Sequence, residues 1–226
     1  MIRNHLCTAV VASAMTFIAA QAEAATFYTE DFTAGTNGWR FATATTLTPV
    51  GSGGPDGSPY VSRTFDPTSA APIIFRAQEE FPGIDFSYTG NWISLGVNEV
   101  SAWVRHSLPE AIEFTARFSN PANFPGASYV SSLVPSNTWT KVTFDVTASS
   151  PQNVTYEGTS HATVMSNVGH MQFGANIPSS LQSGPAVEYT FDFDGLEVLT
   201  IPEPASASLA ALACSGLSLV VRRRRR

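Results

Sequence analysis

Two tryptophans in the middle of the chain have the chemistry to bind a sugar, because an indole can stack on a pyranose ring. Trp103 and Trp139 each lie out of phase with the aliphatic residues of their own segments, so both indoles should point away from the more aliphatic face. Tryptophan is highly buried on average, and no polar residues cluster beside these two in the sequence. We therefore expect both to pack in a second buried layer. If that face is exposed instead, they form a carbohydrate-binding surface.

The sequence carries no catalytic motif. It has no Gly-x-Ser-x-Gly nucleophile elbow. The histidines His106, His161 and His170 lack the spacing of metal ligands. Glu110 and Glu113 are a candidate carboxylate pair for a glycosidase, but their odd separation places them on opposite faces of one strand. We expect no enzymatic activity, and a polysaccharide-degrading enzyme is a distant alternative.

Short alternating segments fill the region from residue 25 to residue 200. Apolar and polar residues that alternate with a period of two mark half-buried strands. The alternation is plainest in Ala111–Phe118, Thr138–Val146 and Val187–Phe193. Further strands are expected at Thr26–Phe32, Trp39–Leu47, Tyr60–Phe65, Glu99–His106, Ser128–Val134 and Val168–Ala175.

Turn-forming residues separate these segments, most plainly in Gly51–Gly57. Short strands with this spacing predict an all-β fold, a sandwich or a barrel, in a single domain. In the last segment, Phe191 and Phe193 are odd-numbered, whereas Leu196 and Val198 are even-numbered. The slip at Asp194-Gly195 predicts a β-bulge.

The N-terminus has the pattern of a secretory signal peptide. A short basic segment that contains Arg3 precedes the uncharged apolar run Leu6–Ala20. Ala22 and Ala24 then supply the small residues at positions −3 and −1 of a cleavage site. The apolar run is short for a bilayer core of roughly 30 Å, so we expect cleavage after Ala24 rather than an uncleaved anchor.

Charge and cysteine content restrict the chemistry of the central region. Residues 25–200 contain six Lys and Arg residues and sixteen Asp and Glu residues, a net charge of −10. Such a surface repels phosphate and argues against nucleic-acid binding. Cys7 and Cys214 are the two cysteines of the chain, and both lie outside this region, which therefore has no disulfide or thiolate chemistry.

The C-terminal segment combines three features in order. Pro202, Glu203 and Pro204 precede the uncharged run Ala205–Val221, which is close to the shortest length of a transmembrane helix. The chain closes on a basic cluster that should stay on the cytoplasmic side of the membrane. That cluster is Arg222, Arg223, Arg224, Arg225 and Arg226. The prolines should keep the residues before the run extended and accessible to a processing enzyme.

This order resembles the PEP-CTERM sorting signal of bacterial surface proteins, over residues 201–226. The resemblance implies that exosortase, a membrane transpeptidase, recognises Pro202, Glu203 and Pro204 and removes the helix. It also implies transient anchoring in the cytoplasmic membrane and delivery to the cell surface or the extracellular space. A plain tail anchor that is never cut is the alternative.

Motifs of the central region resemble those of laminin-B-like and galactose-binding-like jelly rolls. They are Glu30–Trp39, Gly54–Tyr60 and Phe191–Asp194. The resemblance implies one jelly-roll β-sandwich whose first and last strands lie together and hold a structural calcium ion. Its ligands would come from Glu30 or Asp31 and from Asp192 or Asp194, since calcium takes several oxygen ligands. Solvated carboxylates at strand ends are the alternative.

Together these patterns predict three segments, a signal peptide at 1–24, a β-sandwich at 25–200 and a sorting tail at 201–226. We expect an exported, non-enzymatic surface or matrix protein. The alternative is a carbohydrate-binding module for exopolysaccharide, and the exposure of Trp103 and Trp139 separates the two.

Overall fold

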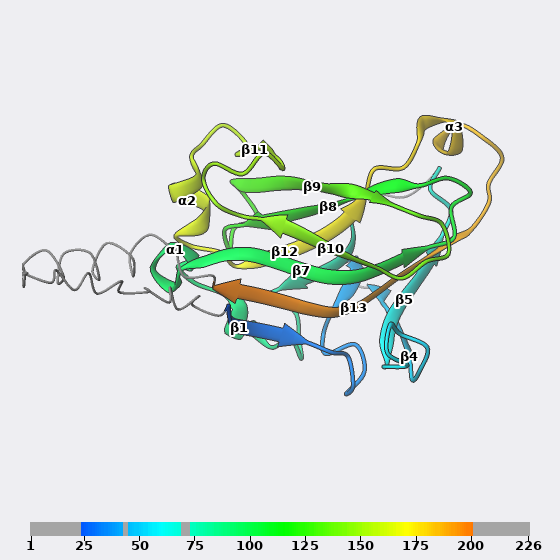
Figure 1. The fold of residues 1–226 in the computed structure, drawn as a ribbon, viewed down its shortest axis with the longest axis horizontal. Helices are drawn as coiled ribbons and strands as arrows, with labels where there is room; N and C mark the ends of the chain where they lie inside the picture. The colour runs from blue at the N-terminus through cyan, green and yellow to red at the C-terminus, as the bar shows by residue number, and fades with distance from the viewer. Residues whose placement is uncertain (1–23, 43–44, 69–72, 201–226) are drawn as a thin grey trace, which may run out of the picture. The chain divides into compact units, whose positions relative to one another are not determined.

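A computed structural model describes residues 24–42, 45–68 and 73–200 and shows a β-sandwich of two antiparallel sheets (Figure 1). The first, sheet A, has the strand order β10-β7-β13-β5-β4, and β1 pairs with β13 as well. Its strands are β1 (Ala25–Glu30), β4 (Thr48–Val50), β5 (Tyr60–Phe65), β7 (Val97–His106), β10 (Thr140–Asp145) and β13 (Tyr189–Thr200).

The second, sheet B, has the strand order β11-β9-β8-β12-β6-β2-β3. Its strands are β2 (Arg40–Ala42), β3 (Thr45–Thr46), β6 (Ile73–Gln78), β8 (Ile112–Ser119), β9 (Gly126–Val134), β11 (Asn153–Thr155) and β12 (His170–Ala175). Short helical turns connect the strands, namely η1 (Phe86–Tyr88), α1 (Trp92–Leu95), α2 (His161–Met165) and α3 (Ser179–Gln182).

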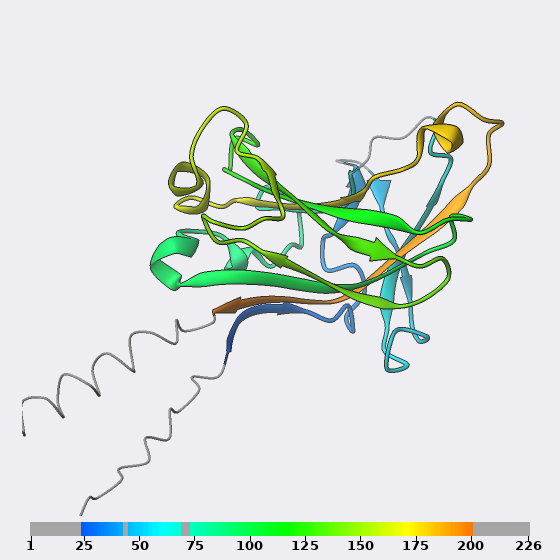
Figure 2. The same ribbon diagram turned by 45° about the horizontal axis from the view of Figure 1, so that its top comes forward.

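β13 organises sheet A because it pairs along both of its edges. β7 follows it along one edge, and β5 and then β1 follow it along the other. Ala25 and Thr200 are direct partners in the β1–β13 ladder, so the first and last strands lie side by side, as the jelly-roll resemblance implied. Figure 2 shows the blue β1 beside the C-terminal half of the orange β13.

The predicted β-bulge in β13 is confirmed. The register with β7 shifts between Asp194 and Glu197, and Gly195 has a φ of +53°. This left-handed conformation carries little cost for glycine alone. Because of the slip, Phe191 and Phe193 before the bulge and Leu196 and Val198 after it are all buried.

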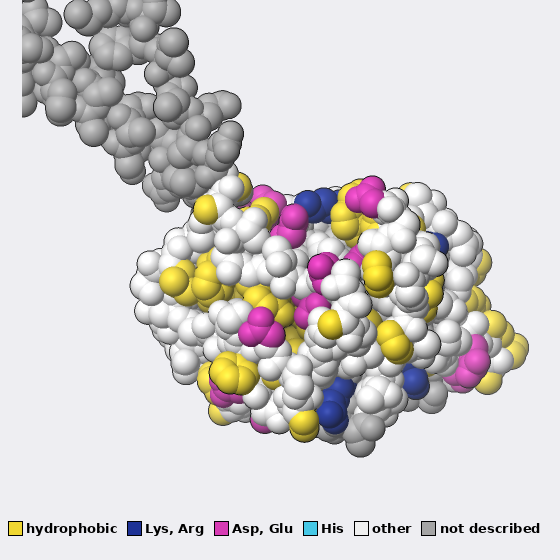
Figure 3. Space-filling view, turned by 90° about the horizontal axis from the view of Figure 1, so that it is seen from below, with side chains coloured by type: hydrophobic (Ala, Val, Ile, Leu, Met, Phe, Trp, Pro, Cys, Tyr) yellow, Lys and Arg dark blue, Asp and Glu magenta, His cyan; other side chains and the backbone are white. Residues whose placement is uncertain are grey.

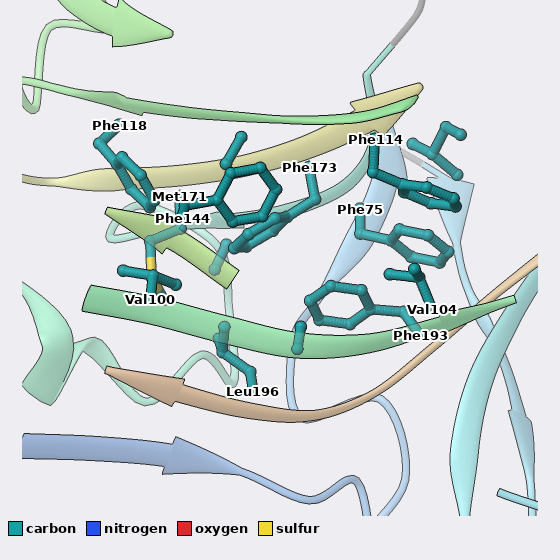
Figure 4. Packing of buried hydrophobic residues seen from close by; sticks show 14 of the residues in the cluster. Phe75, Val100, Val104, Phe114, Phe118, Phe144, Met171, Phe173, Phe193 and Leu196 are labelled. Carbon is teal, nitrogen blue, oxygen red and sulfur yellow. The ribbon is translucent and has the colours of Figure 1, made fainter. Parts of the chain in front are cut away.

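The core between the sheets is dominated by aromatic rings. Phe193 of sheet A packs against Phe75 and Phe173 of sheet B, with ring centroids 4.9 Å apart in both pairs. Trp39 closes the group at 5.5 Å from Phe193. Figure 4 shows these phenylalanines in a layer between β12 and β8 on one side and β7 and β13 on the other. Burial of this apolar area is the main favourable term in folding.

The strands expected from alternation are present, and the structure adds β4, β6 and β11, which the sequence analysis did not predict. The segment Trp39–Leu47 contains two short strands, β2 and β3, rather than one, and residues 43–44 lie outside the described residues. β6 was missed, because Ile74 and Phe75 are adjacent and both fully buried, which breaks the period of two.

Predictions for the two ends of the chain fall outside the described residues, apart from Ala24, which is exposed. They include Ala22 and the whole tail from residue 201 to residue 226. Within the described part of the chain, no helix combines the length and apolar character needed to cross a membrane.

Candidate functional site

The outer face of sheet A carries polar and aromatic side chains on its central strands. On β7, Trp103 and Arg105 alternate with buried neighbours, so they point away from the core. Their direct partners on β13 are Asp194 and Asp192 respectively. Side chains opposite one another in an antiparallel pair lie on the same face and interact. The register therefore places two acidic groups beside a tryptophan and an arginine.

Arg105 lies at the centre of this face. Its Nε donates to Asp192 Oδ2 at 2.8 Å, and its Nη2 donates to the hydroxyl of Tyr60 at 3.1 Å. Burial by itself would lower the pKa of Arg105, but the hydrogen bond and charge of Asp192 outweigh burial and raise it. Asp192 is nearly buried, and its Oδ1 accepts no hydrogen bond from the described residues.

Trp139, one residue before β10, packs over the same group. Its ring lies 4.7 Å from Arg105 Cζ and meets the ring of Tyr60 edge-on at 5.3 Å. Its Nε1 donates to the carbonyl oxygen of Gly53 at 2.9 Å. A guanidinium over an indole face is a favourable cation–π contact. We call Tyr60, Trp103, Arg105, Trp139 and Asp192 the aromatic platform.

Trp103 lies against the bulge of β13. A Cβ atom added to Gly195 would come within 3.0 Å of Trp103 Cδ1, so the glycine leaves room for the indole. Within the described residues Trp103 makes no hydrogen bond, which leaves its N–H available to a ligand.

The orientation predicted for the two tryptophans is confirmed, and their predicted burial is wrong. Trp103 and Trp139 both point away from the core, and both are partly exposed. Tryptophans of the core are Trp39 and Trp92 instead. The prediction failed because it relied on average burial, whereas Trp103 and Trp139 both keep partly exposed positions outside the core.

The loop from Gly51 to Pro59 reaches across the edge of the platform. Ser58 Oγ donates to Asp194 Oδ2, and the N–H of Gly195 donates to Asp194 Oδ1. Burial raises the pKa of Asp194, and these two hydrogen bonds offset only part of the effect. The loop thus uses Ser58 and the Gly53 carbonyl to position Asp194 and Trp139.

The calcium prediction needs one carboxylate from Glu30 or Asp31 and one from Asp192 or Asp194. Asp31 and Asp194 lie near enough for the charge of Asp31 to add to the effect of burial, which raises the pKa of Asp194. Glu30 pairs with the buried Leu196 of β13, and its own side chain is buried. Its carboxylate accepts hydrogen bonds from the N–H of Phe32 and from the side-chain amide of Asn37. Asp192 is engaged by Arg105, and Asp194 lies on the outer face.

Asp31 is exposed and accepts from Thr33. Among the described ranges, no group of three or more His, Cys, Asp or Glu side chains could hold a metal ion. Calcium binding by one residue from each end of the domain stays a prediction.

The three histidines considered for catalysis lie in separate places. His106 is paired with the carbonyl oxygen of Val134, and burial lowers its pKa. His161 is paired with the carbonyl oxygen of Val146. His170 on β12 is paired with Glu80, which lies in the turn after β6. Glu113 accepts a hydrogen bond from Asn176.

Sequence reasoning missed Tyr60 and Arg105. Arg105 follows Trp103 by two residues, so the same alternation argument would have placed both on one face. Tyr60 lies on β5 and Arg105 on β7, the two strands on either side of β13, so their contact depends on the strand order, which no local pattern reveals.

Figure 3 views the sandwich from the side of sheet A, and acidic side chains gather near the middle of this face.

Comparisons with known proteins add little to the description of the site. No family model matches the chain, and neither does any curated protein. One similar solved structure is that of the N-terminal CBM22-1 and GH10 modules of endo-1,4-β-D-xylanase 10B from Clostridium thermocellum, in complex with xylohexaose. It is 15% identical, with a TM-score of 0.48, and the match covers 77% of this chain and 28% of that one. At this level the likeness carries no conclusion about ligand or activity.

Proposed function

We propose that the chain is an exported, non-catalytic surface protein whose β-sandwich binds polysaccharide through the aromatic platform. The observation that carries the proposal is the position of Trp103 and Trp139. Trp103 lies on β7 and Trp139 directly precedes the neighbouring strand β10, and both are outside the core on one partly exposed sheet face. An inert scaffold has no need for indoles at such positions, so the structure favours the carbohydrate-binding alternative.

The chemistry of the platform fits a sugar ligand. Sites for uncharged ligands combine apolar surface with a few fixed polar groups that set orientation. Here the indoles supply the apolar surface, and Arg105 is held in place by Asp192 and Tyr60. The N–H of Trp103 lacks a protein partner among the described residues, so a sugar hydroxyl would add a hydrogen bond there.

Loss of binding is expected when either indole of the platform is removed. Trp103→Ala and Trp139→Ala should each weaken binding of the full chain to its polysaccharide at least about tenfold, roughly 1.4 kcal/mol. The polysaccharide is first identified on a glycan array that carries neutral and acidic polymers, and affinities are then measured by isothermal titration calorimetry. Both variants should remain folded, because neither indole belongs to the core.

Phe86→Ala is the matched control, since this ring is 61% exposed and lies outside the platform. Unchanged affinity in both tryptophan variants, or an equal loss in the control, would reject the platform.

Melting temperatures recorded in chelator and in calcium test the calcium prediction, because a ligand that binds only the native state raises the midpoint of unfolding. An identical midpoint in the two conditions removes that prediction.

Export and sorting form the second part of the proposal. They are supported by Ala22 and Ala24 at the N-terminus and by the order Pro-Glu-Pro, apolar run and arginine cluster at the C-terminus. Intact-mass analysis of protein extracted from the cell surface should show a start near Ala25 and loss of residues 205–226. Recovery of the mature protein with its C-terminal run intact would contradict exosortase sorting.

A further inference from the structure

The described residues contain six cationic side chains, and five of them have a partner that offsets the positive charge. Arg105, Arg117 and Lys141 form ion pairs with Asp192, Glu157 and Glu197. Arg63 lies over the ring of Phe41 at 4.4 Å, and Arg40 lies over the ring of Phe81 at 5.2 Å.

Arg76 is the sixth, and it lies on β6 of sheet B. In residues 24–42, 45–68 and 73–200 it makes no hydrogen bond, ion pair or ring contact, and its Nε is buried without an acceptor. Burial lowers its pKa, and no carboxylate lies near enough to oppose that effect. A partly buried guanidinium without an anion is costly. It is unexpected in a region with sixteen acidic residues.

The neighbours of Arg76 make the arrangement less favourable still. Phe75 and Ala77 on either side of it are buried in the core, so Arg76 points to the outer face of sheet B. Its direct partner on β2 is Arg40, and like charges directly opposite one another are destabilising. Its partner on β12 is Gln172, whose two amide atoms are already engaged by Arg117 and Asn123.

Arg117 pairs with Gln172 from the opposite side. Its contacts show how the hydrogen-bond donors of a guanidinium on this face are normally satisfied. Glu157 meets it with both carboxylate oxygens, through Nε and through Nη2. Such a two-point contact is the preferred geometry between arginine and a carboxylate. Nothing supplies this for Arg76 within the described chain.

We propose that Arg76, with Arg40 opposite it, binds the carboxylate of a uronic acid residue in a polysaccharide. The choice of a polysaccharide as carrier rests on the proposed function, whereas the preference for an anion does not. A single carboxylate on a sugar adds little charge, so the net charge of −10 on residues 25–200 does not repel it as it would a polyphosphate. The site lies on the sheet opposite the aromatic platform.

The test compares an oligogalacturonate with its carboxyl-reduced galactose counterpart, using the full chain and titration calorimetry. The acidic oligosaccharide should bind at least about tenfold more tightly, a difference of roughly 1.4 kcal/mol, and the preference should shrink as salt is added. Arg76→Gln should abolish the preference while its melting temperature without ligand stays equal to or above that of the wild type. Arg63→Gln is the matched control and should keep the preference.

Equal binding of the two oligosaccharides by the wild type would overturn the proposal, as would an equal loss in Arg76→Gln and Arg63→Gln. A sulfated oligosaccharide that binds where the oligogalacturonate does not would overturn the assignment to a carboxylate. If the aromatic platform does not bind sugar, the outcome differs from a failure of the Arg76 site. In that case the reduced oligosaccharide fails to bind and Trp103→Ala has no effect, whereas the preference that depends on Arg76 persists.

Discussion

Phe193→Ala is expected to lower the free energy of unfolding by about 3–5 kcal/mol, the usual cost of deleting a large core aromatic. Phe193 is fully buried and its ring packs against those of Phe32, Trp39, Phe75 and Phe173, so it joins both sheets. The cavity left by its removal opens between rigid strands, which limits how far the neighbours can collapse into it. Chemical denaturation of the purified chain measures the change.

The control for this experiment is Phe86→Ala, which removes the same ring from a position that is 61% exposed. We expect the control to change the stability by less than about 0.5 kcal/mol. Similar losses in the two variants would contradict the position of Phe193 at the centre of the core.

Gly54→Ala should be the most disruptive small change near the platform. An added Cβ would come within 2.6 Å of Asp194 Oδ2 and closer still to Ser58 Oγ, and it would meet the Ser58 carbonyl oxygen at 2.9 Å. The loop must then move, and insertion of a methyl group into packed surroundings costs about 1–3 kcal/mol. Because the same loop positions the Gly53 carbonyl that accepts from Trp139, polysaccharide affinity should fall as well.

Gly51→Ala is the matched control in the same loop. A Cβ there meets nothing within 4 Å, and neither glycine has a left-handed backbone. We expect Gly51→Ala to leave stability and affinity unchanged. Parallel denaturation and calorimetry on the two variants test the role of the loop, and equal behaviour would show that the contact between the loop and Asp194 is unimportant.

Local alternation predicted most of the fold. The face of each strand follows from a period of two, and one glycine at a phase break was enough to place the bulge in β13. β6 was not predicted because its adjacent residues Ile74 and Phe75 are both buried, so the strand lacks the period of two. The paired strands are far apart in the sequence, so their order depends on packing between the sheets, which a local pattern does not encode.

The candidate sites depended on longer-range information. Trp103 was placed on the correct face, but the contact between Arg105 and Tyr60 joins residues 45 apart, across β13. Arg76 gave no signal at all in the sequence. Its significance lies in what surrounds it, and the pairing of Arg40 with Arg76 appears only once the register of β2 and β6 is known.

The pairing of β13 along both edges also determines how the domain transmits force. Asp192 of the platform and Thr200, where the described chain ends, belong to this one strand. If the proposed polysaccharide binding and surface attachment hold, tension between the platform and an attachment beyond Thr200 runs along the strand axis. Such a pull loads the ladders to β7 and β1 in shear, so that many hydrogen bonds resist together instead of opening one after another. Under load, the height of the unfolding barrier governs how long the domain survives.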